Sequence, residues 1–131
     1  GRTPLCELLK QADIISLHCP LTDASRHMIG ADELRLMKSD ALLINTARGA
    51  LIDSRALAEA LDAGVIAGAG IDVLAEEPPA DDEPLLSRDR PNLILTPHIA
   101  WTAKESRQRA VDQMVENVAD YLNGGRLRRV I

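Results

Sequence analysis

The sequence has little positive charge, and this scarcity excludes one large class of ligands. Its 131 residues hold 15 Lys and Arg against 20 Asp and Glu, which gives a formal net charge of -5. Proteins that bind nucleic acids use many Lys and Arg contacts to phosphate groups. We therefore predict that the chain binds no nucleic acid, and that local positive groups hold any anionic ligand.

Long apolar runs are also missing. No stretch approaches the roughly 20 apolar residues that a membrane helix needs, and the first residues lack the charged-then-apolar order of a signal peptide. Hydrophobic residues make up 46% and charged residues 27% of the chain, which is typical of a globular domain with one core. These features predict a cytoplasmic protein without a membrane partner.

Cysteine is scarce, and the usual pairs of metal ligands are absent. Cys6 and Cys19 are too few and too irregularly placed for a disulfide framework, so we expect both to be reduced. The histidines His18, His27 and His98 show none of the spacings of common zinc sites. No G-x-S-x-G turn follows an apolar run, so a serine hydrolase is not predicted either. We predict no metal site.

What the sequence does contain is an alternation of short apolar runs with helical patterns, which is typical of a parallel sheet covered by helices. The runs are nearly continuous in apolar character, as expected of strands that are buried on both faces. The fold class is therefore predicted to be α/β. The predicted strands are Ile14 to His18, Leu42 to Asn45, Gly68 to Val73, and Asn92 to Thr96.

Two short helical patterns lie between the predicted strands. Residues Asp32 to Lys38 predict one helix, and Asp53 is a suitable N-cap for a second, which Gly64 would end. Further along, the segment from Glu77 to Asp89 holds three prolines and many charges. This composition predicts an extended loop.

The pattern of the last helix is the clearest of the three. Thr102 followed by Glu105 predicts a capping box at its start, and Gly124 predicts its end. Between them lies an apolar stripe at helical spacing. The stripe consists of Val111, Met114, Val115, Val118 and Leu122.

One expected part of such a fold is absent from the sequence. A doubly wound fold begins with a strand and a G-x-G-x-x-G turn whose backbone amides hold a pyrophosphate. The glycine-rich stretch from Gly64 to Gly70 enters a strand instead of leaving one, so its amides would not lie at a helix N-terminus. We assign these glycines to close packing where the strand begins. The predicted fold is Rossmann-like but incomplete, without the first strand and the glycine-rich turn.

Polar residues follow the carboxyl ends of the predicted strands, where open parallel sheets bind their ligands. The guanidinium of Arg48 suits a carboxylate, although a surface salt bridge would also explain this residue. His98 could move a proton near neutral pH or be a structural histidine. Glu77 could be a solvated loop carboxylate or could favour the imidazolium form of His98. Together the three side chains would suit acid catalysis of carbonyl reduction.

Five segments at these strand ends resemble the D-isomer-specific 2-hydroxyacid dehydrogenase family, in the family's order. The resemblance implies an oxidoreductase that transfers a hydride between NAD or NADP and C2 of a small D-2-hydroxy or 2-oxo acid. It is greatest to the glycerate dehydrogenase, or hydroxypyruvate reductase, branch. The segments are residues 12–22 (ADIISLHCPLT), 44–49 (INTARG), 68–74 (GAGIDVL), 77–78 (EP) and 96–101 (TPHIAW).

The resemblance also implies the roles of individual residues. It places Arg48 on the carboxylate and carbonyl of the substrate, His98 as the proton-transferring group, and Glu77 as the partner of His98. It places Asp72 on the nicotinamide carboxamide, although Asp72 could otherwise be a polar strand end. The cofactor-binding residues that it implies are Cys19, Thr46, Ala47, Arg48, Asp72, His98, Ile99, Ala100 and Trp101.

By the same resemblance, residues 1–131 form the C-terminal part of an NAD(P)-binding catalytic domain, and the substrate-binding domain is absent. We therefore expect this piece to be inactive alone, its parent to be a homodimer, and the strand from Ile14 to His18 to have an unpaired edge or to meet another chain there. An alternative stays open: a non-catalytic module of the same fold that binds a dinucleotide.

Overall fold

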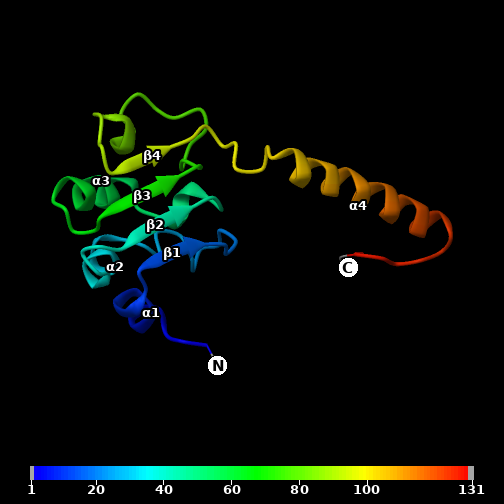
Figure 1. Ribbon diagram of the computed structural model, residues 1–131, viewed down its shortest axis with the longest axis horizontal. Helices are drawn as coiled ribbons and strands as arrows, with labels where there is room; N and C mark the ends of the chain where they lie inside the picture. The colour runs from blue at the N-terminus through cyan, green and yellow to red at the C-terminus, as the bar shows by residue number, and fades with distance from the viewer. Residues whose placement is uncertain (1, 130–131) are drawn as a thin grey trace. The chain divides into compact units, whose positions relative to one another are not determined.

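The computed structural model describes residues 2–129, and the chain divides into two compact units, Gly1–His98 and Ile99–Ile131. The first unit contains a four-stranded sheet in the order β1-β2-β3-β4 (Figure 1). Every neighbouring pair of strands is parallel, which confirms the predicted α/β fold. The strands are β1 (Ile14–Leu17), β2 (Leu42–Asn45), β3 (Gly68–Ile71) and β4 (Leu93–Leu95).

Short helices connect the strands. At the start of α3 (Ser54–Asp62), the Asp53 side chain accepts a hydrogen bond from the Ala56 amide at 3.0 Å. Gly64 follows the end of α3 with φ at 65°. Both features agree with the predicted start and stop. Three other elements, α1, η1 and η2, were not predicted. The helices of the first unit are α1 (Leu5–Gln11), α2 (Ala31–Leu36), the 3-10 helix η1 (Gly49–Leu51), α3 (Ser54–Asp62) and the 3-10 helix η2 (Pro84–Leu86).

Only one face of the sheet is covered by the described helices. Side chains alternate between the faces of a strand, and those of Leu17 and Leu43 are buried in one core with Leu57 of α3. On the opposite face Ile14 is 62% exposed and Ile94 is 70% exposed. The prediction of strands buried on both faces is therefore wrong for the described residues. Because each new strand is added on the same side of the last one, the helical connections stay on one face.

Two local predictions about the sheet agree with the structure. In the described residues, β1 pairs with β2 alone, so it is an edge strand. At Gly68, a Cβ atom would lie 3.0 Å from the carbonyl oxygen of Asn92. This glycine therefore lets β3 and the start of β4 approach closely.

The segment between β3 and β4 is anchored by Arg90, whose side chain is only 5% exposed. Its Nε donates to Asp62 Oδ1 of α3 at 2.8 Å, and its Nη1 donates to the carbonyl oxygens of Pro84 and Leu85. Because η2 lies inside this segment, the prediction of an extended loop from Glu77 to Asp89 is wrong in its second half. The buried guanidinium holds this half against α3.

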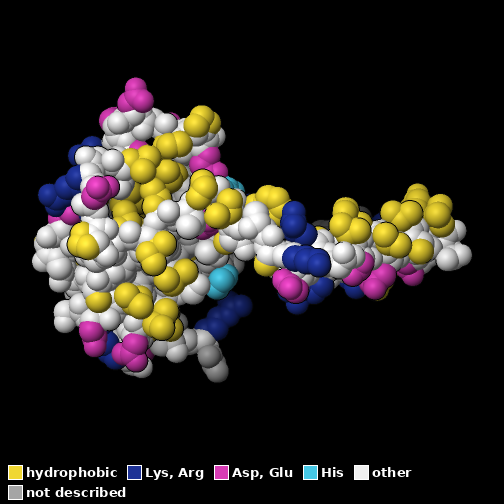
Figure 2. All heavy atoms as spheres, turned by 45° about the horizontal axis from the view of Figure 1, so that its top comes forward, with side chains coloured by type: hydrophobic (Ala, Val, Ile, Leu, Met, Phe, Trp, Pro, Cys, Tyr) yellow, Lys and Arg dark blue, Asp and Glu magenta, His cyan; other side chains and the backbone are white. Residues whose placement is uncertain are grey.

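The second unit contains the helix α4 (Lys104–Leu122). The predicted capping box is wrong: Ala103 is the N-cap, and the Thr102 hydroxyl donates instead to the Ile99 carbonyl at 2.7 Å. Gly124, with φ at 78°, follows its end as predicted. Figure 2 shows hydrophobic side chains along one side of this helix. No described residue of α4 is buried.

Candidate active site

The carboxyl ends of the four strands lie at the same edge of the sheet (Figure 1). His18 and Cys19 follow β1, the turn of residues 46–48 follows β2, Asp72 follows β3, and residues 96–98 follow β4. Ligands of open parallel sheets bind outside this edge. The predicted site residues of the first unit are therefore brought to one part of the fold by the strands that they follow.

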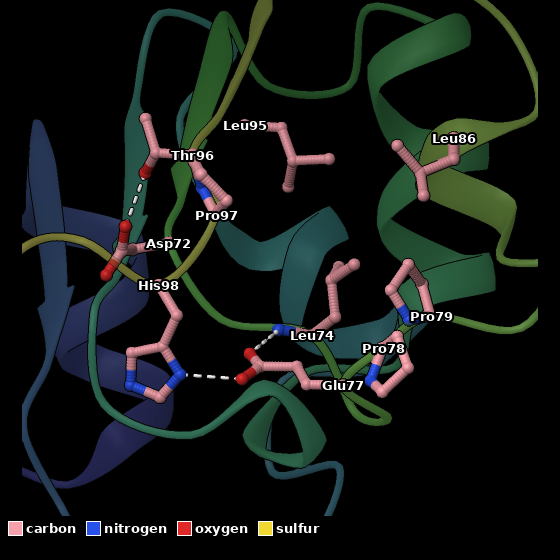
Figure 3. Close-up of a pocket in the computed structure, with 10 residues that line it drawn as sticks. All are labelled: Asp72, Leu74, Glu77, Pro78, Pro79, Leu86, Leu95, Thr96, Pro97 and His98. Atoms are coloured by element: carbon pink, nitrogen blue, oxygen red, sulfur yellow. Dashed lines mark hydrogen bonds and ion pairs between the residues drawn. The ribbon is translucent and has the colours of Figure 1, made fainter.

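His98 and Glu77 contact each other directly (Figure 3). Nδ1 of His98 lies 2.6 Å from Oε2 of Glu77, and Oε1 of Glu77 accepts a hydrogen bond from the Leu74 amide at 2.9 Å. The hydrogen bond with His98, followed by that with the Leu74 backbone, lowers the pKa of the Glu77 carboxyl. Glu77 is therefore a carboxylate at neutral pH, and it fixes the orientation of the His98 ring through Nδ1.

The backbone at His98 is fixed as firmly as its ring. Its φ of 55° is in the left-handed region, which residues other than glycine adopt uncommonly and which often marks functional sites. The His98 amide donates to the Asp72 carbonyl at 2.9 Å. The hydroxyl of Thr96 donates to Asp72 Oδ1 at 2.5 Å, and Asp72 is only 4% exposed. Backbone and side-chain hydrogen bonds thus join the ends of β3 and β4.

Arg48 is exposed, and its Nη1 donates to the Ala47 carbonyl at 2.6 Å. None of the ion pairs formed within residues 2–129 involves Arg48. The surface salt bridge that sequence alone left open is therefore not formed among these residues. The guanidinium remains positioned at the carboxyl edge of the sheet, where it could bind an anion.

Gly49 brings the segment of Arg48 close to the segment of Glu77. A Cβ atom at Gly49 would collide with the backbone of Leu74 and Ala75, so the position requires glycine because of a close approach. Leu74 is the residue whose amide binds Glu77. Sequence reasoning missed this role, although a glycine directly after a strand-end arginine is a signal that could have suggested it.

A cavity of about 360 Å³ adjoins the pair of Glu77 and His98. Figure 3 shows its apolar walls beside the two polar side chains. A mostly apolar cavity with a few polar groups is typical of a site for a small organic molecule. The lining residues are Asp72, Leu74, Glu77, Pro78, Pro79, Leu86, Leu95, Thr96, Pro97 and His98.

The other residues predicted to bind the cofactor differ in their exposure. Cys19 is half-buried and its thiol donates to the Met28 sulfur at 3.5 Å, whereas Thr46 is exposed and Ala47 is half-buried. The segment Ile99 to Trp101 is exposed and begins the second unit, so its role stays a prediction. Both cysteines are free, as expected.

The described residues contain neither a cluster of metal ligands nor a membrane-spanning helix. Among residues 2–129, no group of three or more His, Cys, Asp or Glu side chains is placed to hold a metal ion. Within the same part of the chain, no helix has both the length and the apolar character needed to cross a membrane.

The chain is similar to known proteins in sequence. The sequence profile described as D-isomer specific 2-hydroxyacid dehydrogenase, NAD binding domain, matches residues 1–100. Glycerate dehydrogenase from Methylorubrum extorquens is 52% identical over 124 residues, which are 95% of this chain and 40% of that protein. Glyoxylate reductase from Korarchaeum cryptofilum is 46% identical over 121 residues, which are 92% of this chain and 36% of that protein.

A solved structure agrees in fold. The NAD complexed form of a D-isomer specific 2-hydroxyacid dehydrogenase from Lactobacillus delbrueckii ssp. bulgaricus superposes with a TM-score of 0.83 and 39% identity. The match covers 98% of this chain and 43% of that one. The chain therefore spans about two fifths of the length of the relatives that it matches.

Proposed function

The chain belongs to the D-isomer specific 2-hydroxyacid dehydrogenase family, within its NAD binding domain, and from this premise we propose that the protein is an NAD-dependent oxidoreductase. It transfers a hydride between the cofactor and C2 of a small D-2-hydroxy or 2-oxo acid. The observation that carries the proposal is the 2.6 Å contact of His98 with Glu77 beside a cavity at the carboxyl edge of the sheet. This arrangement supplies a proton-transferring group where a small acid could bind.

The residues at this edge fit the nicotinamide end of the cofactor. Asp72 places a carboxylate at the edge, held by Thr96, and a carboxylate accepts hydrogen bonds from an amide NH₂ group such as that of the nicotinamide carboxamide. Cys19, the turn of residues 46–48 and the segment 98–101 would complete this part of the site. The cofactor, when bound, supplies or accepts the hydride.

The three catalytic side chains have separate tasks in this proposal. His98 gives a proton to the substrate oxygen during reduction and takes it back during oxidation, and such a positioned group contributes about 10²–10⁴-fold to a rate. Glu77 contacts Nδ1 of His98 and fixes the orientation of the ring, so that proton transfer is left to Nε2. Arg48 binds the substrate carboxylate through two parallel hydrogen bonds.

We propose glycerate and hydroxypyruvate, or glyoxylate, as the substrates. The support is the 52% identity to a glycerate dehydrogenase and the 46% identity to a glyoxylate reductase. We propose further that the protein is cytoplasmic, as the lack of long apolar runs predicts, and a homodimer, as the family resemblance implies. A solution mass of the full-length protein would test the homodimer.

The experiment is the reduction of hydroxypyruvate and of glyoxylate by the full-length protein with NADH and with NADPH. We expect turnover with at least one acid. Arg48→Ala should raise KM for that acid roughly 10- to 100-fold, because a charge-assisted pair is lost. Arg55→Ala, which removes an exposed arginine of α3, is the matched control and should leave KM unchanged.

Two results would contradict the proposal. Equal KM values for the wild type and Arg48→Ala would remove Arg48 from the site. Binding of NADH without turnover of any 2-oxo acid would favour the alternative, a non-catalytic module that binds a dinucleotide.

A further inference from the structure

Asn45, the last residue of β2, is a polar side chain in apolar surroundings. It is 1% exposed. In the register of the sheet it is the neighbour of Leu17 in β1 and of Ile71 in β3, which are both buried. A buried amide costs free energy unless its oxygen and its NH₂ group are hydrogen-bonded. The partners of Asn45 therefore indicate why an amide stands at this position.

Both ends of the amide bind the turn that carries Arg48. Oδ1 of Asn45 accepts a hydrogen bond from the Ala47 amide at 3.0 Å, and Nδ2 donates to the Arg48 carbonyl at 2.9 Å. The Asn45 backbone carbonyl accepts from the Asp72 amide at 2.9 Å. One buried residue thus ties the turn after β2 to the end of β3.

The guanidinium of Arg48 depends on this turn for its position. Its Nη1 hydrogen bond goes to the Ala47 carbonyl, which lies in the same turn, and it has no ion pair within residues 2–129. On the other side of the turn, Gly49 lies against the backbone of Leu74. The turn is therefore held by the two side-chain hydrogen bonds of Asn45. The close approach of Gly49 to Leu74 places the turn beside the Glu77 segment.

We propose that Asn45 is a positioning residue for the reaction: its amide holds the turn of residues 46–48 so that Arg48 meets the substrate carboxylate. This rests on the role of Arg48 in the proposed function. Asn45 itself is buried, and both ends of its amide are bound to the turn. Its effect is transmitted through the Ala47 amide and the Arg48 carbonyl.

The chain offers a matched control for the loss of a buried asparagine. Asn92 is half-buried, and its Nδ2 donates to the Leu61 carbonyl at the end of α3 at 3.0 Å. Asn45→Leu and Asn92→Leu both remove a hydrogen bond between an asparagine side chain and a backbone carbonyl. A merely structural role of Asn45 would make the two variants alike in catalysis.

The first measurement is steady-state kinetics of the full-length protein with a 2-oxo acid and NADH. We expect Asn45→Leu to raise KM for the acid by up to about 100-fold, the effect of misplacing a binding group by about 1 Å. kcat should change much less, and Asn92→Leu should leave KM unchanged. If Asn45→Leu does not fold, Asn45→Asp keeps the shape and the acceptor for Ala47 but loses the donor to the Arg48 carbonyl, so it should still raise KM above the wild-type value, and an unchanged KM would overturn the proposal.

A double variant tests whether Asn45 acts through Arg48. Residues that act through one another have non-additive effects, so Asn45→Leu combined with Arg48→Ala should have the same KM as Arg48→Ala alone. Effects that multiply would overturn the proposal, as would an unchanged KM in Asn45→Leu when Arg48→Ala raises KM.

Hydrogen exchange of the backbone amides separates failure of this proposal from failure of the proposed function. Asn45→Leu should accelerate exchange at Ala47, whose acceptor is lost, and Asn92→Leu should not. If the wild type reduces no 2-oxo acid, the proposed function fails, and faster exchange at Ala47 would still support the hold on the turn. Unchanged exchange there would overturn the proposal whatever the substrate.

Discussion

Helices α3 and α4 carry the same kind of amphipathic pattern but have different surroundings. In α3 the apolar side, which includes Leu57 and Leu61, is buried against the sheet. In α4 the apolar stripe is exposed, with Val115 at 64% and Leu122 at 77%. Periodicity therefore identifies an apolar face but not what covers it. The first unit has both the hydrophobic core and the pair of Glu77 and His98.

The largest effect on catalysis should come from His98, because the first unit holds the proposed catalytic side chains. His98→Gln removes the proton-transferring group, and we expect kcat of the full-length protein to fall by about 10²–10⁴-fold. His27→Asn is the control, since Asn tolerates the positive φ of 51° at this exposed position. Unchanged kcat in His98→Gln, or an equal fall in both variants, would place the chemistry elsewhere.

Two truncations compare the helices themselves. Leu57→Ala removes a side chain with 0% exposure and should lower the free energy of unfolding by about 2–5 kcal/mol. Val115→Ala removes an exposed side chain and should change it by no more than about 0.5 kcal/mol. Denaturant unfolding of the 131-residue chain would measure both. A loss at Val115 as large as that at Leu57 would break the comparison, because it would show that the apolar face of α4 is covered in solution.

The features of the fold that the sequence predicts well are set by residues that are close together in the sequence. The apolar runs gave the four strands, and Asp53 and Gly64 gave the two ends of α3, because caps and stops act within one turn of helix. The prediction for α4 fails at Thr102, whose hydroxyl has a competing acceptor in the Ile99 carbonyl. Helix α1 was missed because only Leu9 of its seven residues is buried, which leaves little periodicity.

The candidate site shows the same division between local and distant determinants. Arg48, Glu77 and His98 were predicted because each lies at or near a strand end, within a family-like motif. The contact of Gly49 with Leu74 depends on how two separate segments pack. The two hydrogen bonds of Asn45 are local, but the burial of its side chain depends on the strands on both sides of β2. Sequence alone could not show that these residues hold the site together.

A smaller effect should be seen in how the stability of the first unit depends on pH, through the ion pairs of Asp62. Hydrogen bonds from Arg90 and then Arg88 lower the pKa of Asp62. The pKa of Asp62 is lower in the folded chain than in the unfolded chain. The ion pairs therefore stabilise the folded chain at pH values above the unfolded pKa of about 3.9. This stabilisation is lost as the pH falls through the pKa of the folded chain. The wild type should therefore be more stable than Asp62→Asn at neutral pH, and the difference should disappear in acid. A difference that stays constant in thermal unfolding across this range would contradict the assignment.

The most direct test of whether Glu77 supports catalysis through its contact with His98 compares variants of two neighbouring carboxylates. Glu76 and Glu77 lie side by side in the same exposed acidic segment, but Glu77 is the one that contacts His98. The measurement is kcat/KM for reduction of a 2-oxo acid by the full-length protein. We predict that Glu77→Gln lowers it by about tenfold or more, while Glu76→Gln leaves it within about twofold of the wild type, because Glu76 holds no catalytic group. Equal values for the two variants would contradict the account.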